Sequence, residues 1–227
     1  KVGLKQPKSD ISLGTKELVT KSSKLKFPIL LRPSYVLGGR MMEKMANLDD
    51  VQDYIDQNYW ALENNVILID EFLQNAKEVD VDVLRDNQGN TMIAGIMEHI
   101  EEAGIHSGDS ACSIPPFSLN DKIISDIKKF SISLVNELKI LGLMNIQYAI
   151  KDDEIFILEA NPRASRTIPF LAKAIGIPFI KIAAELIVGK TLTEEYQNFD
   201  NNTLPYFAIK EAVFPFNKFP NTDVILG

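Results

Sequence analysis

The alternation of apolar and polar positions along the chain predicts a series of short strands interspersed with a few helices. Strands are predicted at 27–31, 40–45, 66–69, 79–84, 92–97, 145–150 and 155–161. Helical segments are predicted at 10–24, 47–63, 120–141, 169–175 and 178–188. The pattern shows no internal repeat and no low-complexity segment, and beyond residue 191 it becomes rich in Asn, Pro and Phe.

Residues that break strands or cap helices predict where several of these elements begin and end. Arg32-Pro33 is predicted to end the strand at 27–31, and Asn47 is predicted to cap the following helix. In the longest helix apolar residues recur every three or four positions, which predicts one core-facing stripe followed by Gly142 as the C-cap. That stripe consists of Ile123, Ile127, Phe130, Leu134, Leu138 and Leu141.

Strict alternation marks the segment Glu78-Val79-Asp80-Val81-Asp82. The three acids fall on one face of the predicted strand and the valines on the other. We expect Asp80 and Asp82 to lie on a solvated sheet face.

The segment 156–166 has the strongest chemical pattern in the chain. An apolar run delivers Glu159 and Asn161 to the same face of a strand, and Pro162 then ends strand pairing. Arg163 and Arg166 follow at once. Hard oxygen ligands beside two positive charges suit a magnesium nucleotide and the charge that moves in phosphoryl transfer. The alternative is a strand-edge carboxylate next to solvated arginines.

The preceding strand adds a third oxygen donor if the hairpin has the right register. A three-residue loop at 152–154 would place Gln147 opposite Glu159, whereas a two-residue loop would place it opposite Leu158 and on the other face. In the first register Gln147, Glu159 and Asn161 converge and suit Mg²⁺ or Mn²⁺. The alternative for that register is a buried amide–carboxylate pair satisfied by hydrogen bonds.

Two glycine-containing loops are further candidates. Gly38-Gly39 lies between strands, where it suits either a flexible flap over phosphates or a plain hairpin turn. The loop 104–110 can wrap a sugar or a triphosphate, and in it His106 is a base, a phosphate ligand or a simple loop histidine, with binding favoured. We expect His99 to be structural and Cys112 to be a small residue near the core.

Composition removes several classes of function. The net charge of −7 argues against a general nucleic-acid binder, and no apolar run is long enough to cross a bilayer. With one cysteine and two histidines, no internal disulfide can form and a zinc site is improbable. We therefore expect a cytoplasmic protein without a nucleic-acid or membrane partner.

Four ordered motifs then point to a family: Arg32 to Arg40, Glu98-His99-Ile100-Glu101, His106 to Ser110 and Glu159 to Arg166. Together they resemble the ATP-grasp module of the carbamoyl-phosphate synthase large chain. The resemblance implies an α+β ATP-grasp fold with a lid at 1–69, a main subdomain at 70–190 and an extension at 191–227. The first motif and Ser110-Ala111-Cys112 resemble the second of the two synthetase halves, which phosphorylates carbamate.

The resemblance also implies roles for matching residues. Arg163 and Arg166 would contact carbamate or the transferred phosphate, and Gln147, Glu159 and Asn161 would bind two Mg²⁺ or Mn²⁺ ions. A histidine is common in the family at position 71, so the hinge contact of Glu71 departs from the pattern. The implied nucleotide contacts are Arg32, Gly38, Gly39, Glu71, Leu73, Glu78, Gly104, Ile105, His106, Ser107, Gln147 and Glu159.

The implied reaction converts ATP and carbamate into ADP and carbamoyl phosphate, with K⁺ as an additional candidate cofactor. The implied partners are the other synthetase half and a small glutaminase subunit. The domain that precedes the flap and the regulatory domain of the family are not recognised, so we expect a fragment of the large chain. Two alternatives are another ATP-grasp ligase, such as a biotin carboxylase, and an inert nucleotide-binding module.

Overall fold

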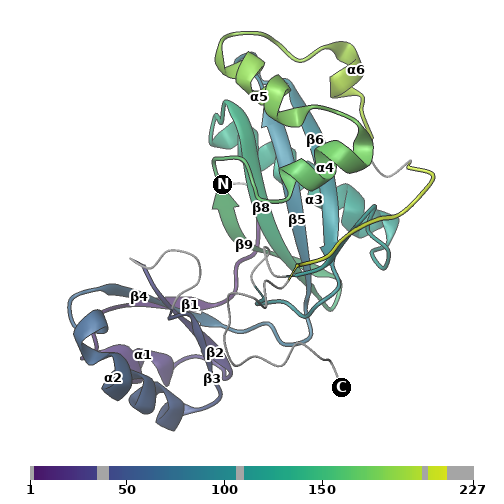
Figure 1. Cartoon of the computed structure of the whole chain (residues 1–227). Coiled ribbons are helices and arrows are strands. Elements are labelled where there is room, and N and C mark those ends of the chain that lie inside the picture. Colours follow the sequence, from purple (N-terminus) through teal and green to yellow (C-terminus); the bar gives the residue numbers. More distant parts are fainter. Residues whose placement is uncertain (1–2, 35–40, 106–109, 201–203, 214–227) are drawn as a thin grey trace.

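The computed structural model describes residues 3–34, 41–105, 110–200 and 204–213. Two antiparallel sheets form two lobes, the smaller one built mainly from the first third of the chain (Figure 1). The chain passes from the smaller sheet to the larger one after residue 71. The predicted boundaries of lid, main subdomain and extension stay predictions.

The smaller sheet has the strand order β1-β4-β2-β3. Its core gathers apolar side chains from the sheet and from two helices, with Leu18, Ile29 and Leu62 fully buried. The predicted cap of the second helix is confirmed, because the Asn47 side chain accepts hydrogen bonds from the backbone N–H groups of Asp49 and Asp50. The elements are β1 (Ser9–Leu13), α1 (Leu18–Ser22), β2 (Ile29–Pro33), β3 (Glu43–Met45), α2 (Leu48–Leu62) and β4 (Val66–Glu71).

Two expectations for this lobe are wrong. Asp10 does not open a helix but lies in β1, which pairs along its whole length with β4. The predicted strand end at Leu31 is two residues early, because Arg32 and Pro33 belong to β2, which ends at Pro33. Because β3 pairs only with Ile29–Leu31, Pro33 lies where the β3 side of β2 is unpaired and its missing N–H breaks no ladder bond.

The larger sheet has the strand order β10-β7-β6-β5-β8-β9, so β5 is an inner strand. A hairpin turn at 86–90 joins β5 to β6, and in it the Asp86 carboxylate accepts hydrogen bonds from the backbone of Gln88 and Asn90. The strands are β5 (Lys77–Arg85), β6 (Thr91–His99), β7 (Cys112–Ile114), β8 (Gly142–Lys151), β9 (Glu154–Asn161) and β10 (Ala208–Lys210). The last of these extends the β7 edge, so part of the segment beyond 191 packs on this sheet.

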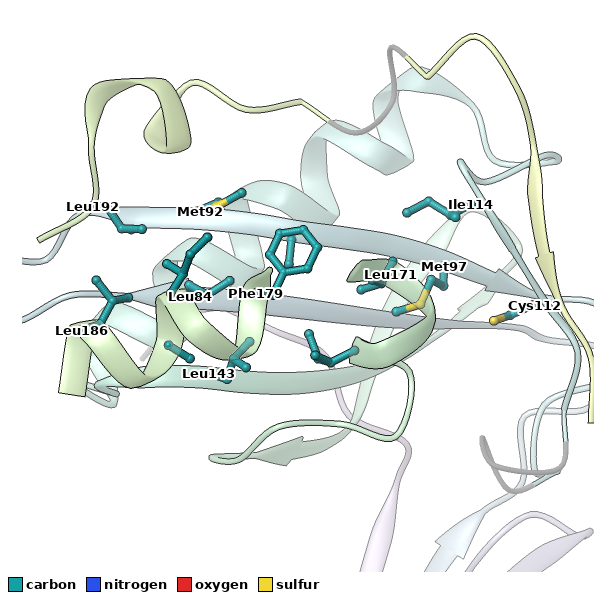
Figure 2. Packing of buried hydrophobic residues seen from close by; sticks show 14 residues of the cluster. Leu84, Met92, Met97, Cys112, Ile114, Leu143, Leu171, Phe179, Leu186 and Leu192 are labelled. Carbon is teal, nitrogen blue, oxygen red and sulfur yellow. The ribbon is translucent and has the colours of Figure 1, made fainter. Parts of the chain in front are cut away.

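Helix α3 (Asp121–Glu137) covers one face of the larger sheet. On the other face α4 (Ile168–Ile175) and α5 (Phe179–Ile187) pack over one end, where Phe179 and Leu186 meet Leu84 and Met92 (Figure 2). Helix α4 approaches β6 closely, because a Cβ atom on Gly95 would lie 2.6 Å from the Leu171 side chain. The short α6 (Glu194–Gln197) follows.

The predicted stripe of the longest helix is only partly correct. Leu138 and Leu141 are 50% and 42% exposed, because the helix ends at Glu137 and the chain turns away from the sheet. Lys139 has positive φ directly after the helix, whereas Gly142, which also has positive φ, opens β8 and is not the C-cap. The buried line is formed by Ile123, Ile127, Ser131 and Val135.

Cys112 is fully buried, as expected. Among the helices that the structure describes, none is long and apolar enough to cross a membrane.

Substitutions at two residues of the predicted stripe, Ile127 and Leu138, test which part of it faces the core. Ile127→Ala should lower the free energy of unfolding by about 2–4 kcal/mol, because Ile127 is fully buried against the sheet. Leu138→Ala should cost about 0.5 kcal/mol or less, because Leu138 is half exposed. Urea denaturation measures both, and equal losses would contradict the observed helix orientation.

Candidate functional site

The β8–β9 hairpin carries the predicted metal ligands. Its turn has two residues, Asp152 and Asp153, both with positive φ, and Lys151 pairs with Glu154. The predicted three-residue loop is therefore wrong. Taken alone, a two-residue turn would have set Gln147 opposite Leu158.

A β-bulge in β9 restores the predicted pairing. Tyr148 pairs with Ile157 but Gln147 pairs with Glu159, so Leu158 is the extra residue of the bulge. Further along the hairpin Asn145 pairs with Asn161. Because cross-strand partners share a face, and so do residues two apart on one strand, Gln147, Glu159 and Asn161 lie on one face of the sheet.

This face offers one carboxylate and two amides. The Glu159 side chain is exposed and makes no hydrogen bond or ion pair with another residue that the structure describes, and Gln147 and Asn161 are half-buried. Oxygen donors of this kind fit Mg²⁺ or Mn²⁺, with phosphates and water completing the shell. Within 3–34, 41–105, 110–200 and 204–213, no three His, Cys, Asp or Glu side chains are grouped to hold a metal, so the face depends on its amides.

The two predicted arginines follow directly from the end of β9. Both are exposed, and the Arg163 guanidinium donates to the Ala164 carbonyl at 3.1 Å. Arg166 makes no hydrogen bond or ion pair with any described residue. Their positive charges are therefore available to an anion beside the Glu159 face.

Asp80 and Asp82 lie on the same face of the sheet as Gln147, because β5 pairs with β8 there. Both side chains are buried, so the prediction that they lie on a solvated face is wrong. They are 1% and 0% exposed. Since β5 has β6 and β8 on either side, its polar face is covered by neighbouring strands and loops. Asn145 on β8 donates toward both carboxylates, at 3.5 Å to Asp80 and 3.3 Å to Asp82.

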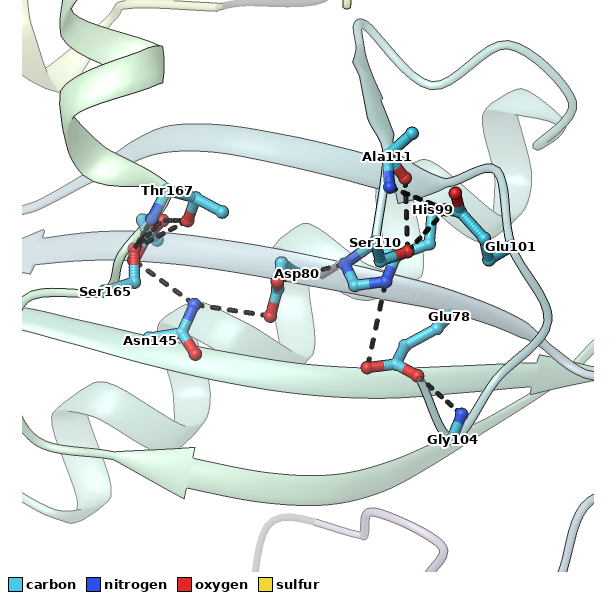
Figure 3. A network of polar contacts seen from close by, with 11 residues as sticks. Glu78, Asp80, His99, Glu101, Gly104, Ser110, Ala111, Asn145, Ser165 and Thr167 are labelled. Atoms are coloured by element: carbon cyan, nitrogen blue, oxygen red, sulfur yellow. Dashed lines mark hydrogen bonds and ion pairs between the residues drawn. The ribbon is translucent and has the colours of Figure 1, made fainter. Parts of the chain in front are cut away.

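His99 joins Asp80 to Glu78, and Figure 3 shows this network running from Ser165 and Thr167 at one end to Gly104 at the other. The His99 Nε2 atom lies 3.0 Å from Asp80, and Nδ1 lies 3.9 Å from Glu78. Burial lowers the pKa of His99, but the hydrogen bond and charge of Asp80 and the charge of Glu78 outweigh it and raise the pKa overall.

Glu78, the predicted ribose ligand, is buried beneath the candidate nucleotide loop. Its carboxylate accepts a hydrogen bond from the Gly104 backbone at 3.0 Å. Burial raises the pKa of Glu78, and the nearby charges of Asp80 and Glu159 add to this effect. Gly104 has φ +103 and packs against Phe72, where a Cβ would lie 2.9 Å from the ring.

The far end of the same loop is anchored by Glu101, which was not predicted as a site residue. Its carboxylate accepts hydrogen bonds from the Ser110 hydroxyl at 2.7 Å and from the Ala111 backbone at 2.6 Å. Burial acts against the charged form, but these hydrogen bonds lower the pKa of Glu101 overall. Ile105 is 42% exposed.

The predicted hinge residues Glu71 and Leu73 line a hollow of about 270 Å³ together with Lys151 and Phe156. None of the predicted metal ligands lines it. The Glu71 carboxylate accepts a hydrogen bond from the Lys26 backbone at 2.8 Å, which fixes the side chain at the junction of the lobes.

Arg32 lies in β2 of the smaller sheet, where its Nε atom donates to Asp70 at 2.7 Å. Gly38, Gly39, His106 and Ser107 lie outside the described residues. The structure therefore brings together Gln147, Glu159 and Asn161, and it joins Glu78 to Gly104 near enough to Glu159 for the two carboxylates to interact.

A family model described as the ATP-binding domain of the carbamoyl-phosphate synthase L chain matches residues 1–195. The chain belongs to this family. The carbamoyl phosphate synthase large chain of Xanthomonas axonopodis pv. citri is 46% identical over 233 residues, a match that covers 100% of this chain and 21% of that protein. The large chain of Synechocystis sp. is 48% identical over 224 residues, covering 99% and 21%. The chain thus spans about a fifth of these curated relatives.

Solved structures confirm the expected ATP-grasp fold of this carbamoyl-phosphate synthase domain. A biotin carboxylase from Campylobacter jejuni has a TM-score of 0.73 at 16% identity, covering 86% of this chain and 45% of that one. A biotin carboxylase domain from Hydrogenobacter thermophilus, solved with MgADP and bicarbonate, has a TM-score of 0.71 at 15% identity, covering 92% and 46%. These likenesses establish the fold.

The residues missed by the sequence analysis are Asp80, Asp82, His99, Glu101, Asn145 and Thr167 of the buried network. A signal was present for the two aspartates. The neighbouring segment 92–97 is apolar throughout, which is typical of an inner sheet region, and an acidic face on an inner strand requires buried partners.

His99 should titrate above its ordinary pKa of 6.5, because burial favours the neutral ring but the hydrogen bond and charge of Asp80 and the charge of Glu78 together outweigh it. The folded state then holds this proton to higher pH than the unfolded state, so its contribution to stability is complete below pH 6.5 and lost as pH rises through the raised pKa. Imidazole NMR signals measure the titration. The chain has two histidines, and His99→Gln assigns the signal by removing it. Titration of that signal below 6.5 would contradict the assigned contacts.

Proposed function

We propose that this domain phosphorylates carbamate with ATP, as the second synthetase half of a carbamoyl-phosphate synthase large chain. Family membership supports ATP binding by the domain. The resemblance of the segments Ser34 to Arg40 and Ser110-Ala111-Cys112 to the second half supports that half over the first.

The observation that carries the proposal is the register of the β8–β9 hairpin. Pairing of Gln147 with Glu159 and of Asn145 with Asn161 gives one face with three oxygen donors, and the strand then runs directly into Arg163 and Arg166. A candidate cation site beside two arginines that form no ion pair with the described residues matches the distribution of charge in a nucleoside triphosphate that transfers its terminal phosphoryl group.

Each group has a distinct task in this proposal. Gln147, Glu159 and Asn161 would hold two Mg²⁺ or Mn²⁺ ions, which supply positive charge to the phosphate oxygens and align them. Arg32, together with Gly38 and Gly39 of the lid, contacts the phosphates from the opposite side. Arg163 and Arg166 hold carbamate and the transferred group, so that a carbamate oxygen attacks the γ-phosphorus in line.

The nucleoside end is assigned to the hinge and to the loop above Glu78. Glu71 and Leu73 border the adenine, and Glu78 binds the ribose. The segment Gly104, Ile105, His106 and Ser107 closes over the nucleotide, which the hydrogen bond from Gly104 to Glu78 supports. K⁺ is a further candidate cofactor.

The assembly and location follow from the same assignment. The partners are the other synthetase half of the large chain and a small glutaminase subunit, and the protein acts in the cytoplasm. Neither a nucleic acid nor a membrane has a role, in keeping with the net charge of −7.

The reverse reaction tests the function. The intact protein that contains these residues is supplied with MgADP and carbamoyl phosphate, and ATP formation is measured. Turnover supports the proposal. Tight MgADP binding without ATP would identify an inert nucleotide-binding module, and activity on biotin rather than carbamate would identify a biotin-dependent ligase.

The metal assignment predicts a selective effect of Glu159→Gln. Removing the carboxylate charge from the face should weaken Mn²⁺ affinity in the presence of ADP by about tenfold or more, a difference of about 1.4 kcal/mol or more, while the fold is kept. Calorimetric titration of Mn²⁺ measures it. Asp153→Asn is the matched control, because Asp153 is an exposed turn residue whose left-handed conformation Asn tolerates. Equal losses in both variants would reject Glu159 as a ligand.

The substrate assignment predicts a different effect of Arg166→Ala. Reverse turnover should fall by about a hundredfold or more, because the guanidinium offsets charge that develops during transfer. MgADP affinity should change little, since the nucleoside contacts lie on other elements. A parallel loss of turnover and MgADP affinity would place Arg166 on the nucleotide instead.

A further inference from the structure

Asp82 lies beneath the loop between β9 and α4 and has no part in the reaction proposed above. Its side chain is completely buried. One carboxylate oxygen accepts hydrogen bonds from the hydroxyl groups of Ser165 at 2.8 Å and Thr167 at 3.0 Å, while Asn145 donates to the other at 3.3 Å. Burial raises the pKa of Asp82 to about 7, against the effect of these hydrogen bonds.

The two hydroxyl groups stand on either side of Arg166. They also lie 2.6 Å from each other, and the Thr167 backbone N–H donates to the Ser165 hydroxyl at 3.2 Å. Thr167 occupies the N-cap position of α4, yet its side chain makes no capping hydrogen bond. Its hydroxyl donates to Asp82 instead, so the contact takes precedence over the usual role of a threonine at that position.

An apolar residue would have been the simpler choice at position 82. Leu84, two residues along the same strand face, belongs to the core beneath α4 and α5. Burying a carboxylate is costly unless it is fully paired, and the partners of Asp82 include both residues that flank an exposed arginine. The buried carboxylate therefore serves contacts with the loop rather than packing of the apolar core.

We propose that Asp82 is a positioning residue that holds the loop of Arg163 and Arg166 in its working conformation through Ser165 and Thr167. The inference rests on the proposed function, because the arginines are assigned there to carbamate and the transferred phosphoryl group. By fixing the backbone before and after Arg166, Asp82 removes the freedom that would let the guanidinium turn away from the site.

The test removes the hydroxyl groups and then their acceptor. Ser165→Ala/Thr167→Val and Asp82→Ala, which removes both acceptor oxygens, are made separately and together in the intact protein that contains these residues. Reverse turnover from MgADP and carbamoyl phosphate should fall by about ten- to a hundredfold in the double variant, while MgADP affinity stays within about threefold. With Asp82→Ala present, the double substitution should lower turnover little further, because the acceptor of both hydroxyl groups is already gone.

Two variants separate positioning from general loss of stability. Ser131→Ala removes another buried hydroxyl, one that pairs with Tyr148 on the α3 face of the same sheet, and it should leave turnover per folded molecule unchanged. Thr167→Ser keeps a hydroxyl at position 167, so this single variant should retain most of the turnover that the single variant Thr167→Val loses. If turnover simply follows the folded fraction in every variant, the positioning role is overturned.

Hydrogen exchange of peptides that cover residues 161–168 gives a readout independent of activity. The hydroxyl-free variant should exchange faster there and unchanged in α3. An inactive wild-type protein would reject the proposed function, and the exchange data would still report whether Asp82 holds the loop. Unchanged exchange at 161–168, or full turnover despite faster exchange, would overturn the present inference.

Discussion

Burial of charge on an inner strand governs the arrangement of this domain. Strand β5 presents Glu78, Asp80 and Asp82 on one face, and side chains and loops that pack over this face bury all three. Each carboxylate must then find donors in the protein. The donors come from His99 on β6, Asn145 on β8 and two loops, so the satisfaction of three acids fixes how those parts sit relative to one another.

The hairpin beside this network shows how a local irregularity sets chemistry. A two-residue turn alone would have placed Glu159 and Asn161 on the face covered by α3. The extra residue Leu158 shifts by one position the alternation of β9 side chains between the two sheet faces. Ile155 and Ile157, near the turn, therefore pack on the α3 side, while Glu159 and Asn161 lie on the opposite face beside Gln147. Turn and bulge together produce the register that neither gives alone.

Much of the fold was predictable where local pattern and burial agree. The cap at Asn47 and the helices near 169–175 and 178–188 follow from residues that act within one or two turns. Predictions failed where distant pairing decided. Asp10 joins a strand because β4 is available to it, and Asp80 and Asp82 are buried because of strands far away in the sequence. The face of Gln147 and Glu159 was predicted correctly for the wrong turn length, since no residue type announces a bulge.

The close packing of α4 on the sheet limits the length of the loop between β9 and α4. Leu171 rests against Gly95, where even one added methyl group would collide, so the helix cannot slide or lift without opening the core. The strand that enters the loop is equally fixed by its ladder with β8. The segment that carries Arg163 and Arg166 is therefore held at both ends, by β9 and by α4. Insertions or deletions in it could be absorbed only by displacing the guanidinium groups, which makes the number of residues between Asn161 and Ile168 as constrained as their chemistry.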